Sequence, residues 1–547
     1  MKKLLIYLMI FFALPISAQK NLSVEQWQSD LRFLQNTALK DYSFLFKKTT
    51  PEKFNLEANA LYNKIPSMEE HEIIVGLGRL VSSFKYGHTF IGFRNLPSFH
   101  HLPLNMYHFN DGVYIQGVHK NYKEVLGAKV IGIGDFTIEE ALQKIYPAVS
   151  SENEQFFKSF GMLYLASPET LHAQGIIKKL SDTIEFTLEK DGEKFKQNFK
   201  VLPNNNRVPL KYSLVQQKDD WLDARDQSIT PNYLKHFDKI YYDEHLPDHK
   251  TVYVRQSQIQ DDPSESISNF YKRVFDFIDK NDVEKLIIDV RLNGGGNNFK
   301  NKSVITEIIK SKKINNVGKL FVIIGRRTFS ASQNLVNEMS NYTNAIFVGE
   351  PTAENINFYG DTKRLVLPNS KIPVYMSFAW WQDKPQWENA EWLTPHIPID
   401  LSFEDYKTNK DPVLEAALSF SDENYILDPM QYMSELFTTG QIAKLKVDVA
   451  KMINDPNYKF FDFENKLSTV GSNLLESGQT KNAVFVFQMI SGFFPNSSKT
   501  LNNLADSYLK IGNKAEALKS YNKVIQLNQD TDAVKYAEKK VKLVSKK

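Results

Sequence analysis

The chain has 547 residues, which is too long for one ordinary domain and predicts about three or four folding units. Its 67 basic and 64 acidic side chains leave a net charge of +3, so we expect no nucleic-acid partner, whose phosphates would need a strongly basic surface. The absence of cysteine excludes disulfides, thiolate metal sites, a lipidated cysteine and a cysteine nucleophile.

Residues 1–18, MKKLLIYLMIFFALPISA, have the pattern of a cleaved secretory signal peptide. Two lysines precede an apolar stretch from Leu4 to Leu14, and the small residues Ser17 and Ala18 follow it. The stretch is shorter than the roughly 20 apolar residues that span a bilayer, and an uncleaved N-terminal anchor is the alternative. We expect export to the periplasm or the extracellular space, with no stable membrane span after signal cleavage.

Residues 19–100 are predicted to be mainly helical. Their clearest segment is PSMEEHEIIVGLGRLVSSF, where Ser67 and Glu70 have the spacing of a capping box and one helical face is apolar. The following YGHTFIGF has the alternation of a strand. His88 is therefore expected at a junction between a helix and a strand.

Residues 101–203 are predicted to form a small β-rich module with a helical insertion. Short strands are expected at GVYIQGV and AKVIGIG, and TIEEALQKI has a helical pattern. In TIEFTLEKDGEKFKQNFKVL, apolar residues alternate on both sides of Asp191-Gly192, a pair typical of a tight turn. That stretch is expected to be a β-hairpin.

Residues 204–420 alternate predicted strands and helices, as an α/β core does. The strands are expected at TVYVRQ, KLIIDV, KLFVII and AIFVGE, with helices near 265–280, near 302–311 and shortly after KLFVII. Because the runs 286–290 and 320–324 are apolar on both faces, we expect an open sheet with helices on both faces.

Residues 421–547 are predicted to form an all-α repeat region. Gly478, Ala483 and Phe487 recur 34 residues later as glycine, alanine and tyrosine, which is the period of the tetratricopeptide repeat. Two repeats are clear, whereas about three are needed for a self-sufficient stack. We expect this region to dock a protein partner or to support the core.

Two loops after strands of the α/β core carry unusual chemistry, and ligands of such sheets gather beyond the carboxyl ends of the strands. The first, DVRLNGGGN, has glycines at 294–296 whose amides can approach an anion, and a plain flexible turn is the alternative. The second, RTFSASQNLV, places Ser330 at the start of a helix, with the Ala331 amide beside it. A serine there is either a helix cap or a nucleophile.

A serine nucleophile needs a base within hydrogen-bond reach, and His88 has the most suggestive setting among the 11 histidines. A structural histidine is the alternative for this residue. The other histidines form no convincing metal site, because His71 lies outside any H-E-x-x-H motif. Pro247 disfavours a shared helical face for His245 and His249. We expect no metal and no other cofactor.

Four stretches resemble, in their order and their residues, motifs of the tail-specific or C-terminal processing serine peptidases, a family that includes the tricorn-type core. They are FKYGHTFIGF, IIDVRLNGGGN, RRTFSASQNLVNEM and FVGEPT. The resemblance covers about residues 65–420. It implies that residues 101–203, which contain LGAKVIGIGDFTIEEAL, are similar to a PDZ module. In relatives such a module binds the C-terminal end of the substrate by strand addition.

The resemblance also implies roles for single residues. Ser330 matches the nucleophile of the family, and the amides of Ala331 and Gly295 match its oxyanion donors. Asn355 stands where the processing branch has a lysine base. The tricorn-like branch, in which an early histidine is the base, therefore fits His88 better.

The residue that orients His88 is not given by the motif. Gly87 stands where the tricorn-type core has a serine for this purpose, so a carboxylate must act directly or through water. Glu388, Glu391 and Asp361 are the candidates, and we favour Glu388.

These residues together predict a serine-type peptidase that cleaves peptide bonds of unfolded or C-terminal protein segments. Two alternatives stay open. One is an exported peptide-binding or scaffold protein with a decayed peptidase site, which Asn355 and Gly87 favour. The other is an esterase that uses the same serine.

Overall fold

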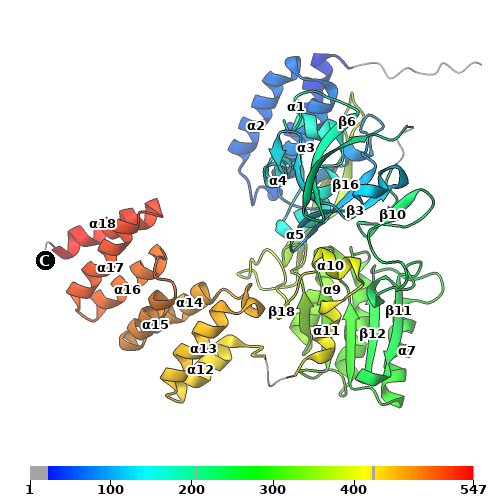
Figure 1. Cartoon of the computed structure of the whole chain (residues 1–547). Coiled ribbons are helices and arrows are strands. Elements are labelled where there is room, and N and C mark those ends of the chain that lie inside the picture. Colours follow the sequence, from blue (N-terminus) through cyan, green and yellow to red (C-terminus); the bar gives the residue numbers. More distant parts are fainter. Residues whose placement is uncertain (1–21, 204–206, 422–424, 546–547) are drawn as a thin grey trace, which may run out of the picture. The chain divides into compact units, whose positions relative to one another are not determined.

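The computed structural model describes residues 22–203, 207–421 and 425–545 (Figure 1). The expected signal peptide, residues 1–18, lies outside the described residues. Contacts divide the chain into two compact units. Unit 1 comprises Met1–Asp226 and Ala353–Glu391, and unit 2 comprises Gln227–Thr352 and Trp392–Lys547. Within the described part of the chain, no helix has the length and apolar character needed to cross a membrane.

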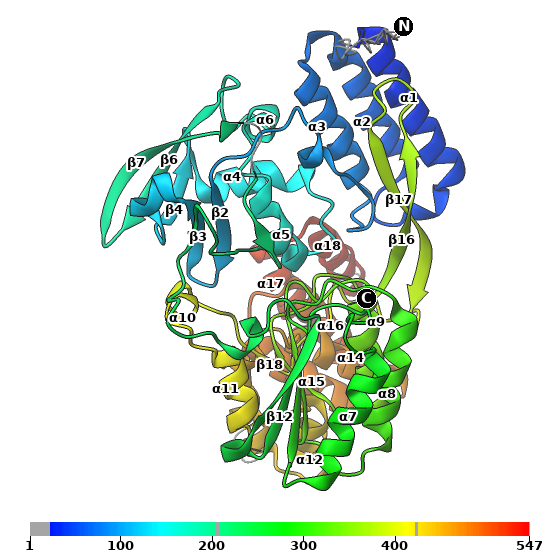
Figure 2. The same cartoon turned by 90° about the vertical axis from the view of Figure 1, so that its right-hand side faces the viewer.

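Three helices and a small sheet form one part of unit 1. The helices are α1 (Val24–Asp41), α2 (Pro51–Lys64) and α3 (Glu70–Ser82). The sheet has the order β1 (Phe90–Ile91), β17 (Pro373–Gln382) and β16 (Asn357–Val366). Apolar residues of all three helices and of the β16–β17 hairpin share one core, and Figure 2 shows the hairpin beside these helices.

Two sequence predictions for this part need correction. Helix α3 begins at Glu70, and its capping box is formed by Glu69 and Glu72, not by Ser67 and Glu70. The side chain of Glu69 accepts the amide hydrogen of Glu72, and the side chain of Glu72 accepts that of Glu69. Of YGHTFIGF, only Phe90–Ile91 pairs as a strand, because the partner strand β17 meets the chain there.

A second sheet of seven strands completes unit 1. Its strands are β2 (Leu104–Phe109), β3 (Gly112–His119), β4 (Lys129–Ile133), β5 (Phe136–Thr137), β6 (Thr183–Lys190), β7 (Glu193–Lys200) and β10 (Trp221–Asp223). Between β5 and β6 the chain forms α4 (Ile138–Ile145), α5 (Glu154–Phe160) and α6 (Pro168–Ala173). A short pair, β8 (Leu210–Lys211) and β9 (Leu214–Val215), lies before β10. The predicted hairpin at Asp191-Gly192 is confirmed as β6–β7.

Unit 2 contains a mixed, mostly parallel six-stranded sheet. In spatial order its strands are β11 (Tyr241–Leu246), β12 (Thr251–Gln256), β13 (Lys285–Asp289), β14 (Leu320–Ile324), β15 (Ile346–Gly349) and β18 (Ile397–Pro398). Only the β11–β12 pairing of this sheet is antiparallel. Four of the five strands that pair in parallel, β12 to β15, coincide with the runs predicted from the sequence, and β18 was not predicted.

Helices cover both faces of this sheet, because successive strand residues point to opposite faces. They are α7 (Ile267–Lys280), α8 (Asn301–Lys310), α9 (Ala331–Tyr342) and α11 (Pro412–Ser419). The short helix α10 (Phe403–Lys407) precedes α11 in the chain. Leu286 and Ile288 share a core with α7, α8 and α9, whereas Ile287 shares a core with α11. Figure 2 shows α7 and α8 on one side of β12 and α11 on the other.

The C-terminal part of unit 2 is entirely helical. It comprises α12 (Pro429–Thr438), α13 (Ile442–Asn454), α14 (Phe463–Glu476), α15 (Thr480–Phe493), α16 (Ser498–Lys510), α17 (Lys514–Leu527) and α18 (Thr531–Ser545). The repeat predicted from the 34-residue spacing matches this pattern of helix pairs. Ala483 and Ala517 are both fully buried, and Gly478 and Gly512 both have positive φ, at 79° and 80°.

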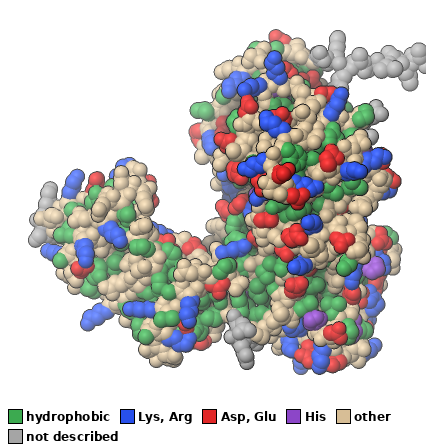
Figure 3. Space-filling model, viewed as in Figure 1, with side chains coloured by type: hydrophobic (Ala, Val, Ile, Leu, Met, Phe, Trp, Pro, Cys, Tyr) green, Lys and Arg blue, Asp and Glu red, His purple; other side chains and the backbone are tan. Residues whose placement is uncertain are grey.

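On the face shown in Figure 3, Lys and Arg side chains are interspersed with Asp and Glu side chains. This distribution agrees with the small net charge of +3. It differs from the continuous basic surface that nucleic-acid binding requires.

Candidate active site

Ser330 has an unusual backbone at the start of α9. Its φ is 58° and its ψ is −130°, a combination found at the second position of type II′ turns, where glycine dominates. Its side chain makes no capping hydrogen bond to the helix, so the capping interpretation does not apply. The amide of Ala331 is the first of α9 and therefore has no acceptor within the helix. The positive end of the helix dipole lies at the same place.

The glycine loop after β13 approaches Ser330 closely. A Cβ on Gly295 would lie 2.6 Å from the Cβ of Ser330 and 3.0 Å from the Ala331 nitrogen, so no other residue fits there. The φ of Gly295 is also positive, at 101°. The Phe329 amide donates to the Asn293 carbonyl at 3.2 Å and ties the two loops together. The loops after neighbouring parallel strands thus meet at one edge of the sheet, as the sequence predicted.

The amide of Gly295 has an acceptor of its own. It donates to Oδ1 of Asn293 at 3.0 Å. We expected this amide to be an oxyanion donor from the family resemblance. The Gly295 N–H can stabilise an oxyanion only if it breaks its hydrogen bond to Asn293 or donates to Asn293 and the oxyanion together.

His88 lies between α3 and β1, at the predicted junction of helix and strand. The next residue, Thr89, holds this turn to β17: its hydroxyl lies 2.6 Å from that of Ser377 and also accepts the Ser377 amide at 3.1 Å. The imidazole stacks on Phe358 of β16, with ring centroids 6.1 Å apart. Residues far apart in sequence therefore orient the His88 ring.

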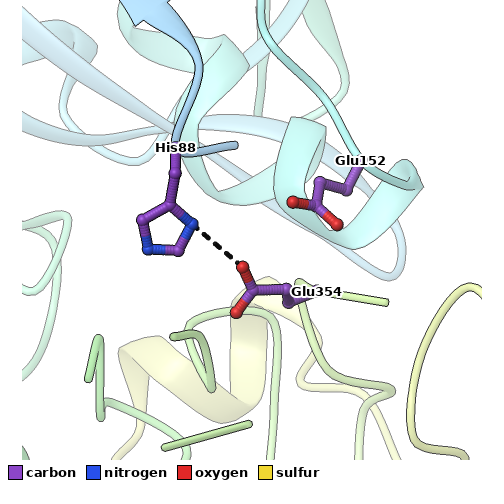
Figure 4. A group of neighbouring side chains, drawn as sticks. All are labelled: His88, Glu152 and Glu354. Atoms are coloured by element: carbon purple, nitrogen blue, oxygen red, sulfur yellow. Dashed lines mark ion pairs between the residues drawn. The ribbon is translucent and has the colours of Figure 1, made fainter. Parts of the chain in front are cut away.

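A buried carboxylate faces this histidine. Nδ1 of His88 lies 3.0 Å from Oε1 of Glu354, whose side chain is fully buried, while that of His88 is 14% exposed (Figure 4). The contact is not aligned as a straight hydrogen bond, which is common at catalytic sites before substrate binds. A proton on Nδ1 would be held by Glu354 and would leave Nε2 as a hydrogen-bond acceptor.

Burial lowers the pKa of His88 from its usual value. The charges of Glu152 and Asp361 act in the opposite direction and raise it. Because burial is the larger effect, the imidazole is neutral at neutral pH. A neutral imidazole is the form that accepts a proton.

The structure gives the place beside His88 to Glu354, and not to the Glu388 that we favoured. Glu388 is exposed, and its carbonyl accepts a hydrogen bond from Asn357 at 3.1 Å. The sequence analysis missed Glu354, although it lies two residues after the GEPT stretch. Glu354 directly precedes Asn355, and this position is the one signal in the sequence that points to it.

A second buried carboxylate, Glu152, belongs to the same group. Polar atoms of His88, Glu152 and Glu354 all lie within 4.8 Å of one another. Such residues can bind zinc, but both oxygens of Glu152 already accept hydrogen bonds, from Gly87 and Asn355. The group therefore fits a hydrogen-bonded network better than a metal site.

Comparisons with known proteins agree with the resemblance. Residues 250–399 match the model of peptidase family S41, and residues 498–531 match the tetratricopeptide repeat. The solved structure of mature CPAF is 12% identical with a TM-score of 0.50, covering 74% of this chain and 99% of that chain. At this identity the likeness concerns the fold alone.

Two further solved structures are less similar. Mature CPAF complexed with lactacystin is 12% identical with a TM-score of 0.49, covering 72% of this chain and 97% of that chain. A putative peptidase from Parabacteroides merdae is 14% identical with a TM-score of 0.37, covering 74% of this chain and 100% of that chain. No curated protein matches the chain. Residues 250–399 thus identify a serine peptidase domain of family S41 in this chain, and residues 498–531 identify a tetratricopeptide repeat.

Proposed function

We propose that the protein is an exported peptidase that hydrolyses peptide bonds of unfolded or C-terminal protein segments through an acyl-enzyme on Ser330. The observation that carries the proposal is the backbone of Ser330, held at φ 58° beside Gly295 and the first amide of α9. Non-glycine residues in such conformations concentrate at functional sites, where the surrounding structure maintains the strain.

The proposed chemistry is acyl transfer. Ser330 Oγ attacks the substrate carbonyl carbon while Nε2 of His88 takes its proton, and the carbonyl oxygen becomes an oxyanion. The amide of Ala331 stabilises this oxyanion, and the amide of Gly295 joins it when it turns from Asn293. His88 then gives the proton to the leaving amine, and water hydrolyses the acyl-enzyme by the same route.

Glu354 takes the part in this mechanism that the sequence analysis assigned to Glu388. Its carboxylate holds the imidazole by Nδ1 and stabilises the positive charge that forms on the ring during attack. The support is its complete burial and its distance of 3.0 Å from Nδ1. Ser330 belongs to unit 2, whereas His88 and Glu354 belong to unit 1.

The β-rich module, residues 101–203, is proposed to bind the C-terminal end of the substrate in the manner of a PDZ domain. Strand addition needs a sheet edge, and β10 and β7 are the end strands of the five-strand path β10-β3-β4-β6-β7 in the seven-stranded sheet. The tetratricopeptide region is proposed to bind a protein partner. Residues 1–18 are proposed to direct export.

A peptide-binding protein without activity is the second candidate. The observation that favours it is the hydrogen bond from the Gly295 amide to Asn293, which leaves one expected oxyanion donor occupied. Such a protein would bind unfolded segments and release them intact.

Incubation with a chemically unfolded protein distinguishes these candidates. We expect the purified mature protein to release new amino groups, and Ser330→Ala and His88→Ala each to abolish the release. Binding without release by the unmodified protein would overturn the peptidase and support the peptide-binding candidate. Hydrolysis of small esters but not of peptide bonds would indicate an esterase instead.

A further inference from the structure

Two residues of this chain depart from the motifs of its family, Gly87 and Asn355, and both donate hydrogen bonds to the same side chain. The amide of Gly87 donates to Oε1 of Glu152 at 3.0 Å. Asn355 donates to Oε2 of Glu152 twice, from its amide at 3.3 Å and from Nδ2 at 2.5 Å. Gly87 precedes His88, and Asn355 follows Glu354. One carboxylate thus connects the backbone that carries the imidazole to the backbone that carries its partner.

We infer that Glu152 is a positioning residue of the peptidase site. It holds His88 and Glu354 in fixed relative positions by accepting hydrogen bonds from Gly87 and Asn355, their neighbours in the chain. The inference deepens the proposed function and rests on His88 acting as the base. Glu152 reaches neither substrate nor proton in this account. It acts through the placement and the electrostatics of the imidazole.

The segment that carries Glu152 is itself anchored on both sides. Ser150 lies within hydrogen-bond distance of Ser82 at the end of α3, at 3.0 Å between the hydroxyls. Asn153 caps α5 by accepting the Phe156 amide at 2.9 Å, and its Nδ2 donates to the Glu391 carbonyl at 2.6 Å. Residues 150–153 are all buried. Because this segment is anchored on both sides of Glu152, the carboxylate can hold the groups that donate to it.

The chemistry of a carboxylate suits this position. Gly87 and Asn355 present only N–H donors, and an ionised carboxylate is the side chain that accepts on both oxygens and donates on neither. Burial of a carboxylate without such donors would be strongly unfavourable, so the burial of Glu152 depends on the N–H groups of Gly87 and Asn355. Glutamine has one acceptor oxygen, and its NH₂ group would face a donor on one of the two sides.

The charge of Glu152 also acts on His88. Burial raises the pKa of Glu152 to about 7, while the nearby positive charge of Lys48 lowers it and Glu354 raises it further. The charges that raise the pKa of His88 are those of Glu152 and Asp361. Above about pH 7, where Glu152 is ionised, its charge favours the imidazolium that forms on His88 during attack.

The test compares Glu152→Gln with a matched control, Glu154→Gln, in the full mature chain. Glu154 is exposed and forms an ion pair with Lys158 on the surface of α5. The rate constant for modification of Ser330 by a fluorophosphonate is measured across pH. We expect Glu152→Gln to lower it about tenfold or more, since small misplacements of catalytic groups cost up to about 100-fold. We expect Glu154→Gln to match the unmodified protein at every pH.

A second readout does not depend on activity. The His88 ring is followed by NMR with ¹³C-labelled histidine, and its signal is identified as the one absent from His88→Ala. We expect the chemical shift of the His88 ring to change in Glu152→Gln, because the hydrogen bonds that position its backbone are altered, and to stay in place in Glu154→Gln. If Glu152→Gln fails to fold, Asn355→Ala, which removes only the 2.5 Å bond, takes its place, with an expected loss of rate of about threefold or more.

The outcomes separate this inference from the function on which it rests. Modification of Ser330 at the same rate and with the same pH profile in Glu152→Gln would overturn the positioning role and leave the peptidase intact. A protein that is never modified at Ser330, but whose His88 signal moves in Glu152→Gln, would overturn the peptidase and support the positioning role of Glu152.

Discussion

At the scale of single residues, the conformation of Ser330 distinguishes a nucleophile from a helix cap. A serine cap has a backbone in the β region and accepts an amide hydrogen from the first turn, as Ser266 does for α7. Ser330 does neither. Its positive φ is energetically unfavourable, and the surrounding structure maintains it.

Replacement of Ser330 by glycine is predicted to stabilise the protein relative to replacement by alanine. Alanine keeps the steric cost of φ 58°, whereas glycine does not, and the difference is about 1 kcal/mol. The measurement is the midpoint of urea unfolding of Ser330→Gly and Ser330→Ala, two variants that both lack the hydroxyl. A glycine variant no more stable than the alanine variant would show that the backbone is relaxed there.

The pH dependence of the proposed reaction follows from the direction of the His88 shift. Only the neutral imidazole accepts a proton, so the rate rises with pH through the pKa of His88. Burial lowers that pKa, and the acid limb is therefore predicted below the ordinary histidine value of about 6.5. The profile of kcat/KM for a peptide substrate measures it. A limb well above that value would mean that another group is the base.

The identity of the carboxylate at His88 illustrates what residue patterns leave open. Ser330, His88 and the glycine loop were found because their types and spacing carry chemical meaning. Glu354 and Glu388 are alike in the sequence, and tertiary structure alone buries one and exposes the other. Glu152 was not found at all, because its donors come from segments 65 and 203 residues away.

At the scale of elements, the candidate site depends on two loops that follow the neighbouring parallel strands β13 and β14. Strands such as 320–324 were predictable because they are continuous apolar runs with helices between them. Their parallel pairing follows from the helical crossovers, and parallel pairing brings both loops to one edge of the sheet. The meeting of Gly295 with Ser330 is thus a consequence of topology that the sequence indicates.

A pair of glycine substitutions tests this meeting. Gly295→Ala is predicted to abolish modification by a fluorophosphonate, because its Cβ would lie 2.6 Å from that of Ser330 at a φ of 101°. Gly294→Ala is the control, because a Cβ there meets only Arg327 Nη2, at 3.9 Å. Equal modification of both variants would contradict the close approach. Circular dichroism of each variant verifies that the fold is retained.

The β16–β17 hairpin shows where element prediction fails. We expected residues 353–391 within a continuous core at 204–420, but contacts place them in unit 1. The reason is pairing over a long sequence separation: Thr89 bonds to Ser377, which is 288 residues away. Local patterns indicate a strand but not its partner, so such an exchange between units is not visible in the sequence.

At the scale of the whole molecule, the residues of the proposed mechanism are divided between the two units. Unit 1 contains His88, Glu354 and Glu152, and unit 2 contains Ser330 with its loops. The order of the segments was predictable from the family resemblance. The division of the chemistry between the units was not.

The absence of cysteine allows a direct test of proximity. In His88→Cys/Ser330→Cys, the two introduced thiols are the only ones in the chain. A short bifunctional thiol reagent is predicted to link them within one molecule, because a serine and its base lie within hydrogen-bond reach, about 2.6 to 3.2 Å. Mass spectrometry of the digest identifies the linked peptides. Separate modification of both thiols, without a link, would argue against a shared site.

The most direct measurement for the account as a whole is the mapping of a fluorophosphonate adduct on the purified mature protein. The account predicts one adduct, on the peptide that contains Ser330, and its loss in both Ser330→Ala and His88→Ala. An adduct on a different residue, or full modification of Ser330 in His88→Ala, would contradict it.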